Sequence, residues 1–186
     1  MELKSTRRIV TGHDANGKAV ALIDAPQQAM QRSAGGNAIT MLWVAEETPA
    51  DLSATSDRAK TKVGVPPPES GSIFRIVDFP PILATGSAEH VDHDKILRAM
   101  GIDPATQGYA RHANTHRTRS IDYAIVLEGE IDMLMDDSEV NMRAGDVLVQ
   151  QGTNYAWVNN GAKPCRIAFI LIDGKTPPAW KQDWKK

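Results

Sequence analysis

The sequence predicts an all-β fold: a mostly β chain arranged as a sandwich or barrel rather than as alternating strands and helices. Short apolar runs recur at spacings near ten residues through the second half of the chain. Gly, Asn or Asp closes each run, and these are residues that tight turns favour. The chain has 186 residues, of which 41% are hydrophobic. It can therefore bury one sizeable core, and we expect one structural domain.

The first part of the chain is predicted to start with a β-hairpin. Residues 7–13 and 18–23 are apolar and β-branched in pattern, and they flank the dipeptide Asn16-Gly17. That dipeptide supplies the positive φ values that a tight hairpin turn needs. Residues 38–44 form a further apolar, β-branched run, which predicts a third strand.

The middle of the chain combines a long connection, a strand and a helix. Residues 48–70 are polar and rich in proline, so we expect a surface connection there. Residues 72–79 return to a strand pattern. Residues 92–100 carry apolar residues along one stripe, and Gly101 follows as a C-terminal stop, which predicts a short helix.

The second half of the chain is a series of strands separated by turns. The predicted strands are 123–127, 130–135, 139–142, 146–150, 155–158 and 166–172. Residues 177–184 are too short to form a substantial helix, and we expect their two tryptophans to dock on the body of the protein.

Composition and charge exclude several classes of protein. The formal net charge is −2 and the basic residues are scattered, so no surface should attract nucleic acid or anionic lipid. No apolar run approaches the roughly 18 residues of a membrane span, and no signal-peptide pattern opens the chain. We expect a soluble, cytoplasmic protein with no nucleic-acid or membrane partner. The single cysteine, Cys165, lies in an apolar strand pattern and is expected to be a buried, unreactive thiol.

The stretch from His116 to Gly129 is the most informative part of the sequence. It resembles the first half of a cupin metal motif, with His116 in the first histidine position, Asp122 in the glutamate position and Gly129 at the closing turn. Thr118 stands where the second histidine of the motif belongs. The stretch therefore keeps the frame of the motif and lacks part of its ligand set.

Residues 145–157 are similar to the second half of the same motif, which opens on Gly145-Asp146. Tyr155 replaces the histidine that usually ends this half. The resemblance covers residues 112–173. It implies the cupin double-stranded β-helix, a jelly-roll barrel with N-terminal extension strands and a short helix, whose two motif halves line a small-molecule cavity.

The resemblance also implies a domain organisation. Residues 1–79 would form an N-terminal β extension with a proline-rich loop, residues 80–173 the cupin barrel, and residues 174–186 a C-terminal tail. In this family the N-terminal strands extend the sheets and often pair between two subunits. We therefore expect a homodimer.

A metal site would need three or four converging ligands. His116 and Asp122 occupy matching positions, but a threonine hydroxyl is a poor ligand and a tyrosine must first lose a proton whose pKa is near 10. His112 is four residues from His116, which on one strand is about 13 Å. His90 and His93 stand beside aspartates, but acids at the start of a helix are explained by the helix dipole. We therefore expect no metal ligands and no cofactor.

Without a metal, the barrel interior can still carry acid–base chemistry. We expect His116 to act as general acid or base, since its ordinary pKa lies near the working pH. Asp122 would hold the imidazole tautomer, and Tyr155 would donate a hydrogen bond to a developing oxyanion. Four further residues are expected to contact the substrate: His112, Thr118, Gln150 and Trp157.

Three functions are compatible with these residues. The first is a small-molecule lyase or isomerase, of the decarboxylase or dehydratase type, that acts on a carbonyl-containing or aromatic metabolite. The second is a metal-dependent cupin dioxygenase, and the third is a non-catalytic small-molecule-binding cupin. A structural alternative is a polar-tolerant core in which His116 bonds to Asp122 and Tyr155 fills the mouth of the barrel.

Overall fold

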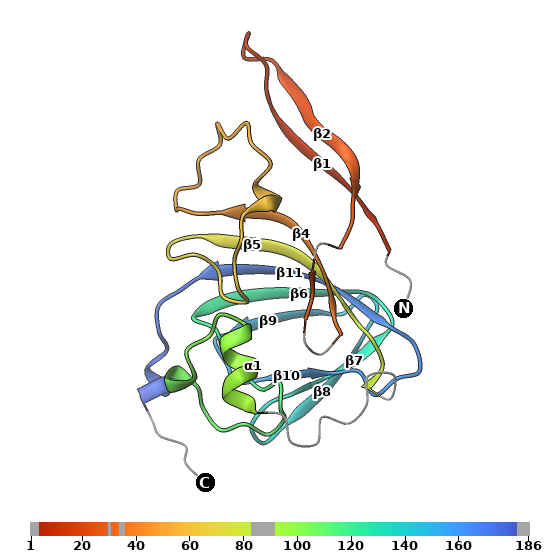
Figure 1. The fold of residues 1–186 in the computed structure, drawn as a ribbon, viewed down its shortest axis with the longest axis vertical. Helices are drawn as coiled ribbons and strands as arrows, with labels where there is room; N and C mark the ends of the chain where they lie inside the picture. The colour runs from red at the N-terminus through yellow and green to blue at the C-terminus, as the bar shows by residue number, and fades with distance from the viewer. Residues whose placement is uncertain (1–3, 30, 34–35, 83–91, 182–186) are drawn as a thin grey trace.

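A computed structural model describes residues 4–29, 31–33, 36–82 and 92–181 of the chain (Figure 1). His90, Val91 and Trp184, which entered the sequence predictions, lie outside these ranges. The strands are β1 (Thr6–His13), β2 (Ala19–Gln27), β3 (Gln31–Arg32), β4 (Ala38–Ala45), β5 (Ser72–Phe79), β6 (Ser120–Glu128), β7 (Glu130–Leu134), β8 (Glu139–Arg143), β9 (Val147–Gln151), β10 (Ala156–Val158) and β11 (Cys165–Asp173). The helices are α1 (His93–Ala99) and the 3₁₀ turns η1 (Arg58–Lys60), η3 (Pro104–Thr106) and η4 (Pro178–Lys181).

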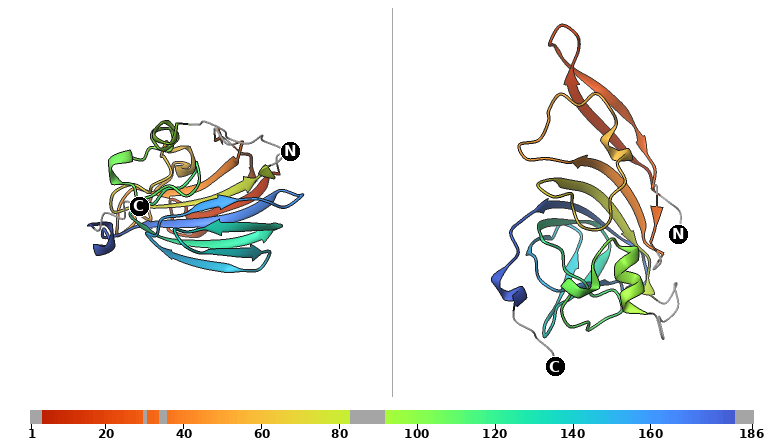
Figure 2. Two further views of the ribbon diagram at one scale, coloured as in Figure 1. Left: turned by 90° about the horizontal axis from the view of Figure 1, so that it is seen from below. Right: turned by 60° about the vertical axis from the view of Figure 1, so that its left-hand side comes forward.

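Two antiparallel sheets face each other and form the expected barrel, so the mostly β prediction is confirmed. One sheet has the strand order β3-β4-β5-β11-β6-β9, and the other has the order β10-β7-β8. Figure 2 shows the two sheets from a second direction, with α1 and the neighbouring loops at one side. The sheets are built mainly from the second half of the chain, where the turn-spaced apolar runs predicted them.

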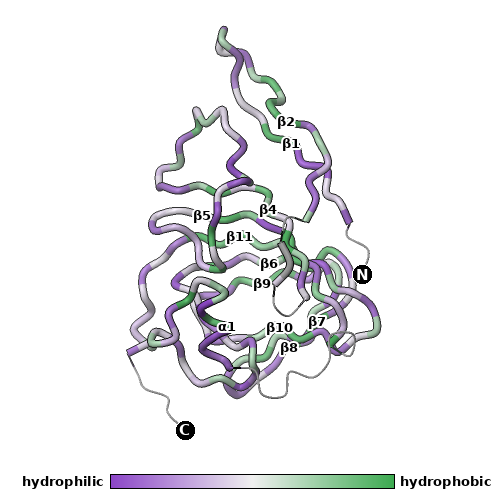
Figure 3. The backbone as a smooth tube through the Cα atoms, in the orientation of Figure 1, coloured by the Kyte–Doolittle hydropathy of each residue, from purple (hydrophilic) through white to green (hydrophobic). Residues whose placement is uncertain are grey.

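The core lies between the two sheets. Its buried side chains come from both, and include Ile73 of β5, Val126 of β6, Ile131 of β7 and Ile167 of β11. Figure 3 shows hydrophobic segments along these strands. Cys165 is fully buried, and burial raises the pKa of its thiol to about 12, as expected for an unreactive cysteine.

The predicted N-terminal hairpin is confirmed. β1 pairs with β2, and Gly17 has a φ of +76° in the turn between them. The hairpin projects away from the barrel (Figures 1 and 2). Arg8 anchors its base by donating to both carboxylate oxygens of Asp57 at 2.7 Å and to the carbonyl of Leu42.

The strands that follow the hairpin continue the larger sheet. β4 pairs with β5, and β5 pairs with β11, so the sheet runs across residue 80. The predicted boundary between the N-terminal extension and the cupin barrel, at residues 79 and 80, stays a prediction. The connection from β4 to β5 is long, as expected, and contains only the short turn η1 among its described elements.

The predicted short helix is confirmed as α1. Asp92 caps its N-terminus by accepting from the backbone N–H of Lys95, which accounts for an acid at this position. Gly101 follows the helix with a φ of +73°. His93 contacts the carbonyl oxygen of Thr115 through Nε2 at 2.7 Å, so the helix is tied to the residue that precedes His116.

The C-terminal tail docks on the barrel through one of its tryptophans. Trp180 in η4 donates from Nε1 to the carbonyl of Gly152 at 2.8 Å. The guanidinium of Arg117 lies 4.3 Å above the Trp180 ring. Within the described part of the chain, no helix is long and apolar enough to cross a membrane.

The outer face of the larger sheet carries exposed apolar side chains. Phe74, Tyr123, Ile125, Leu127, Val147 and Val149 lie on β5, β6 and β9 and are between 37% and 71% exposed. The homodimer stays a prediction, which light scattering coupled to size-exclusion chromatography would check.

Gly129, the turn residue of the first motif half, should be harder to replace than Gly17. Both have positive φ, but a Cβ on Gly129 would lie 2.7 Å from the carbonyl oxygen of Pro164, whereas a Cβ on Gly17 would meet nothing within 4 Å. Gly17→Ala should cost about 1 to 2 kcal/mol from backbone strain alone. Gly129→Ala should cost on the order of 1 to 3 kcal/mol more, because backbone must also move. Urea unfolding of both variants measures the difference, and equal losses would contradict this packing.

Candidate functional site

His116 and Tyr155 are brought together from the two motif halves by a direct backbone pairing. The amide of His116 donates to the carbonyl of Tyr155, and the amide of Tyr155 donates to the carbonyl of His116, both at 2.9 Å. The two residues therefore face each other as a cross-strand pair, and their ring centroids are 4.5 Å apart. The first and last positions of the motif thus meet inside the barrel.

Asp122 lies further along the same inward face. From His116 to Asp122 every second residue is buried, as strand alternation requires. Ser120 donates to Asp122 Oδ1 at 2.5 Å, and its hydroxyl also lies 2.8 Å from that of Thr118. Gln150 of β9 is the direct register partner of Asp122.

Arg75 of β5 completes the cluster and was missed by the sequence analysis. It shares the inward face of β5 with Ile73, Val77 and Phe79, which belong to the core. Its charge acts on His116, Asp122 and Tyr155. One feature of the sequence could have pointed to Arg75: it is a charged residue at the two-residue spacing that also places apolar residues on the inward face of the strand. The interior cluster is defined as Arg75, His116, Asp122, Gln150 and Tyr155.

All five side chains of the interior cluster are closed to solvent. Their exposed fractions are 7% for Arg75 and His116, 4% for Gln150 and Tyr155, and 3% for Asp122. Two surface hollows lie elsewhere: one between Glu130, Asp132, Asn141 and Asn160, the other beside Trp43, Asp51 and Arg58. Neither hollow is lined by a residue of the interior cluster.

His116 is held as a neutral imidazole. Desolvation is the main cause that lowers its pKa to about 4, and the positive charge of Arg75 lowers it further. The Nδ1 atom lies 2.8 Å from the carbonyl oxygen of Asn114, so Nδ1 carries the proton and Nε2 is left as the acceptor. The expectation that Asp122 sets the tautomer is wrong, because a backbone carbonyl already occupies Nδ1.

Asp122 and Tyr155 both hold their protons more tightly than in water. Burial raises the pKa of Asp122 to about 6, and the hydrogen bond from Ser120 and the charge of Arg75 only partly oppose this. Burial, with the nearby charge of Asp122, also raises the pKa of the Tyr155 phenol, while Arg75 and a hydrogen bond with Gln150 lower it. The cluster thus combines a neutral base, a carboxyl that titrates near neutrality and a protonated phenol.

The other predicted contact residues lie at the edges of this cluster or in the core. Trp157 packs against Phe79, Phe169 and Tyr155, so it forms part of the apolar wall. Thr118 is buried beside Ser120. His112 is half-buried in a turn, where its Nδ1 accepts from the amide of Asn114.

Arg117 and Arg119 point away from the interior, as alternation predicts. Arg119 forms an ion pair with Asp173 at 3.0 Å. The guanidinium of Arg117 donates to the carbonyl of Thr106 and stacks on Trp180. Both arginines fix the segment that carries His116.

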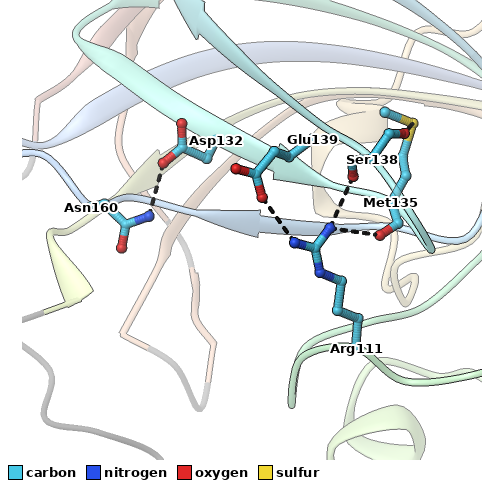
Figure 4. A network of polar contacts seen from close by, with 6 residues as sticks. All are labelled: Arg111, Asp132, Met135, Ser138, Glu139 and Asn160. Carbon is cyan, nitrogen blue, oxygen red and sulfur yellow. Dashed lines mark hydrogen bonds and ion pairs between the residues drawn. The ribbon is translucent and has the colours of Figure 1, made fainter.

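Polar contacts also anchor the loop that leads into His116. Arg111 donates to the carbonyls of Met135 and Ser138 and to Glu139 at the end of the β7–β8 hairpin (Figure 4). Asn160, which follows β10, donates to Asp132 of β7 at 2.8 Å. The bonds of Arg111 tie the loop to the smaller sheet, to which β10, the strand directly after Tyr155, also belongs.

The residues of the cluster do not fit a three-ligand metal centre. Over the described ranges, no group of three His, Cys, Asp or Glu side chains converges. His116 Nε2 and Asp122 are two ligand types that a divalent metal accepts, but the threonine hydroxyl at position 118 is a poor ligand and hydrogen-bonds to Ser120. Two such side chains are fewer than the three ligands that a metal centre needs.

Comparison with known proteins agrees with this architecture. The family described as "Cupin domain" matches residues 100–172. The chain is 32% identical over 183 residues to a cupin-domain-containing oxidoreductase, srdD, of Neurospora crassa, and the alignment covers 93% of this chain and 78% of that protein. It is 31% identical over 181 residues to a cupin-domain-containing oxidoreductase, virC, of Hypocrea virens, with the same two shares covered.

A third relative belongs to a biosynthetic cluster. Phomopsin biosynthesis cluster protein C' of Diaporthe leptostromiformis is 29% identical over 177 residues, covering 94% of this chain and 82% of that protein. All three alignments span nearly the whole chain and so extend well beyond the motif region.

The shifted pKa values of His116 and Asp122 should have opposite effects on stability between pH 7 and pH 5. The pKa of His116 is lower in the folded protein, so the unfolded chain binds more protons and stability falls as the pH falls through this range. The pKa of Asp122 is higher in the folded protein, so protonation of the folded state increases stability as the pH falls. In the wild type these contributions largely cancel.

Single substitutions should separate the two contributions. When the pH is lowered from 7 to 5, the free energy of unfolding of His116→Gln should rise by roughly 1 to 2 kcal/mol relative to that of the wild type. The free energy of unfolding of Asp122→Asn should fall by a similar amount relative to the wild type. Urea unfolding at both pH values measures these differences, with Asp24→Asn on the exposed hairpin as control. Changes of the same sign in both variants would contradict the assignment.

Proposed function

The chain belongs to the cupin superfamily, and we propose that it is a small-molecule lyase or isomerase that moves a proton at a carbon atom next to a carbonyl or carboxylate group. The observation that carries this proposal is the carboxyl of Asp122, which is buried inside the barrel with a pKa of about 6, on the inward face that also carries the neutral imidazole of His116, and whose charge acts on the protonated phenol of Tyr155. A group that titrates near the working pH is the most effective proton carrier.

In this proposal the proton is moved by Asp122 rather than by His116. A pKa of about 4 makes the imidazole a weak base, whereas the carboxylate of Asp122 can accept a proton from carbon and return it. His116 contributes a neutral Nε2 that can accept a hydrogen bond from a substrate hydroxyl. His116, Asp122 and Tyr155 therefore remain the residues proposed to act chemically, but the acid–base role passes from His116 to Asp122.

Tyr155 is proposed to stabilise the negative charge that develops on the substrate. Loss of a proton or of carbon dioxide next to a carbonyl places charge on oxygen as an enolate forms. A phenol that stays protonated in a buried site is a strong hydrogen-bond donor for that oxygen. The contact with Gln150 and the ring contact with His116 fix where the Tyr155 side chain lies.

Asp122→Asn should lower turnover by about 100-fold or more, since general acid–base catalysis contributes this much. The assay follows deuterium uptake from solvent into a panel of 2-oxo, 3-oxo and phenolic acids by proton NMR, with a chelator present. The wild-type rate should rise with pH through an apparent pKa near 6. Tyr155→Phe should also be slow but should keep this pH dependence.

The control for this experiment is Asp24→Asn, because Asp24 is an exposed carboxylate paired with Arg7 on the hairpin. Its rate should equal that of the wild type. Full turnover by Asp122→Asn would remove Asp122 from the mechanism. Tight ligand binding without any conversion by the wild type would instead favour the non-catalytic cupin.

A redox reaction is the second candidate, because two relatives are named cupin-domain-containing oxidoreductases. The names of those proteins support a redox reaction, whereas the small number of side chains that could ligate a metal opposes a metal-dependent one. Oxygen consumption that a chelator abolishes and iron(II) restores would favour this candidate over proton transfer.

Replacing Tyr155 by histidine tests the metal question directly. His116, Asp122 and the new imidazole would supply three ligands, the minimum for a facial site. Calorimetric titration with nickel should therefore show tighter binding by Tyr155→His than by the wild type, and only modest affinity, since Thr118 remains. Equal and tight binding by both proteins would contradict the proposed metal-free site.

A further inference from the structure

Arg75 differs from the two other arginines that are buried in the described structure. Arg8 is paired with both oxygens of Asp57 at 2.7 Å. Arg166 lies 3.4 Å from Asp78 and donates to Thr6. Arg75 has no carboxylate within 4 Å among the described residues, although it is as deeply buried as the other two.

The hydrogen-bonding groups of Arg75 are also incompletely used. Its Nη1 donates to the carbonyl of Gly64 over a long distance of 3.4 Å, and its buried Nε has no hydrogen-bond partner among the described residues, as is also true of the Nε of Arg8. The carboxylate of Asp122 is bonded to Ser120 instead. An arginine that is buried without its own ion pair is costly, and an anionic ligand bound beside it would offset that cost.

We propose that Arg75 binds the carboxylate group of a small organic acid inside the barrel, next to Asp122, Tyr155 and His116. This inference rests on the proposed function, because it names the substrate class of the same site. The planar guanidinium offers parallel N–H donors that match the two oxygens of a carboxylate. Bound in this way, an organic acid would present its neighbouring carbon atom to the interior cluster.

The surroundings favour a carboxylate over a phosphate. Arg75 is the single cation in the interior cluster, and the charge of Asp122 acts on it from the same interior. A dianion would therefore be repelled by Asp122 and neutralised only in part. The core side chains on either side of Arg75, Ile73 and Val77, would contact an apolar or aromatic body attached to the carboxylate.

Binding can be tested without knowing the natural substrate. Calorimetric titrations would use acetate, benzoate and cinnamate, their three amides, and inorganic phosphate. The wild type should bind at least one of these acids tenfold or more tightly than its amide, and more tightly than phosphate. Arg75→Met should lose that preference, whereas Arg7→Met, which removes an exposed ion pair with Asp24 on the hairpin, should keep it. A preference that survives in Arg75→Met, or the absence of any preference in the wild type, would overturn the inference.

A stability measurement checks the same assignment independently. Methionine is similar in length to arginine and carries no charge, so Arg75→Met should melt at the same temperature as the wild type or higher. Arg8→Met should melt lower, because it breaks the pair with Asp57. A lower melting temperature for Arg75→Met, equal to that of Arg8→Met, would show that Arg75 serves the fold and not a ligand.

The outcomes separate this inference from the proposed function. If the wild type prefers the acids and Arg75→Met does not, but no proton exchange is found, the carboxylate site stands and the lyase or isomerase fails. If the wild type exchanges protons and Arg75→Met keeps full activity and acid binding, the proposed function stands and the carboxylate site is wrong.

Discussion

The interior cluster is buried in a barrel whose core is otherwise largely apolar, and the removal of its side chains from water sets their ionisation. Desolvation raises the pKa of Asp122 and Tyr155 and lowers that of His116, and the charge of Arg75 acts on all three. Without burial these would be ordinary side chains. With it, the interior holds a carboxyl near neutrality, a neutral imidazole and a phenol that keeps its proton.

The barrel holds these groups in place mainly by strand register. The paired backbones of His116 and Tyr155 set one edge of the cluster, and the pairing of Asp122 with Gln150 sets another. Two contacts outside the barrel then fix the segment that carries His116. Arg111 donates to Glu139 of the smaller sheet, and Trp180 of the C-terminal tail stacks on Arg117. The fold thereby keeps polar groups in a core where each would be costly if it could move.

Most of the fold could be predicted from the sequence, because strands and turns leave local signals. The Asn16-Gly17 turn, the run at 72–79 and the helix before Gly101 all depend on neighbours in sequence. The motif positions likewise predicted that His116 and Tyr155 meet. Arg75 could not be placed, since its neighbours in the cluster are more than forty residues away in the chain. The tautomer of His116 was assigned wrongly because a backbone carbonyl, which carries no sequence signal, occupies Nδ1.

The central claim is that burial raises the pKa of Asp122 to about 6, while the charge of Arg75 keeps it below the value that burial alone would give. The most direct measurement is an NMR titration of the Asp122 side-chain carboxyl carbon in the wild type and in Arg75→Met. The account predicts a pKa near 6 in the wild type and a higher value in Arg75→Met, since the charge of Arg75 lowers it. A pKa near the ordinary value of about 4 in the wild type, unchanged in Arg75→Met, would contradict it.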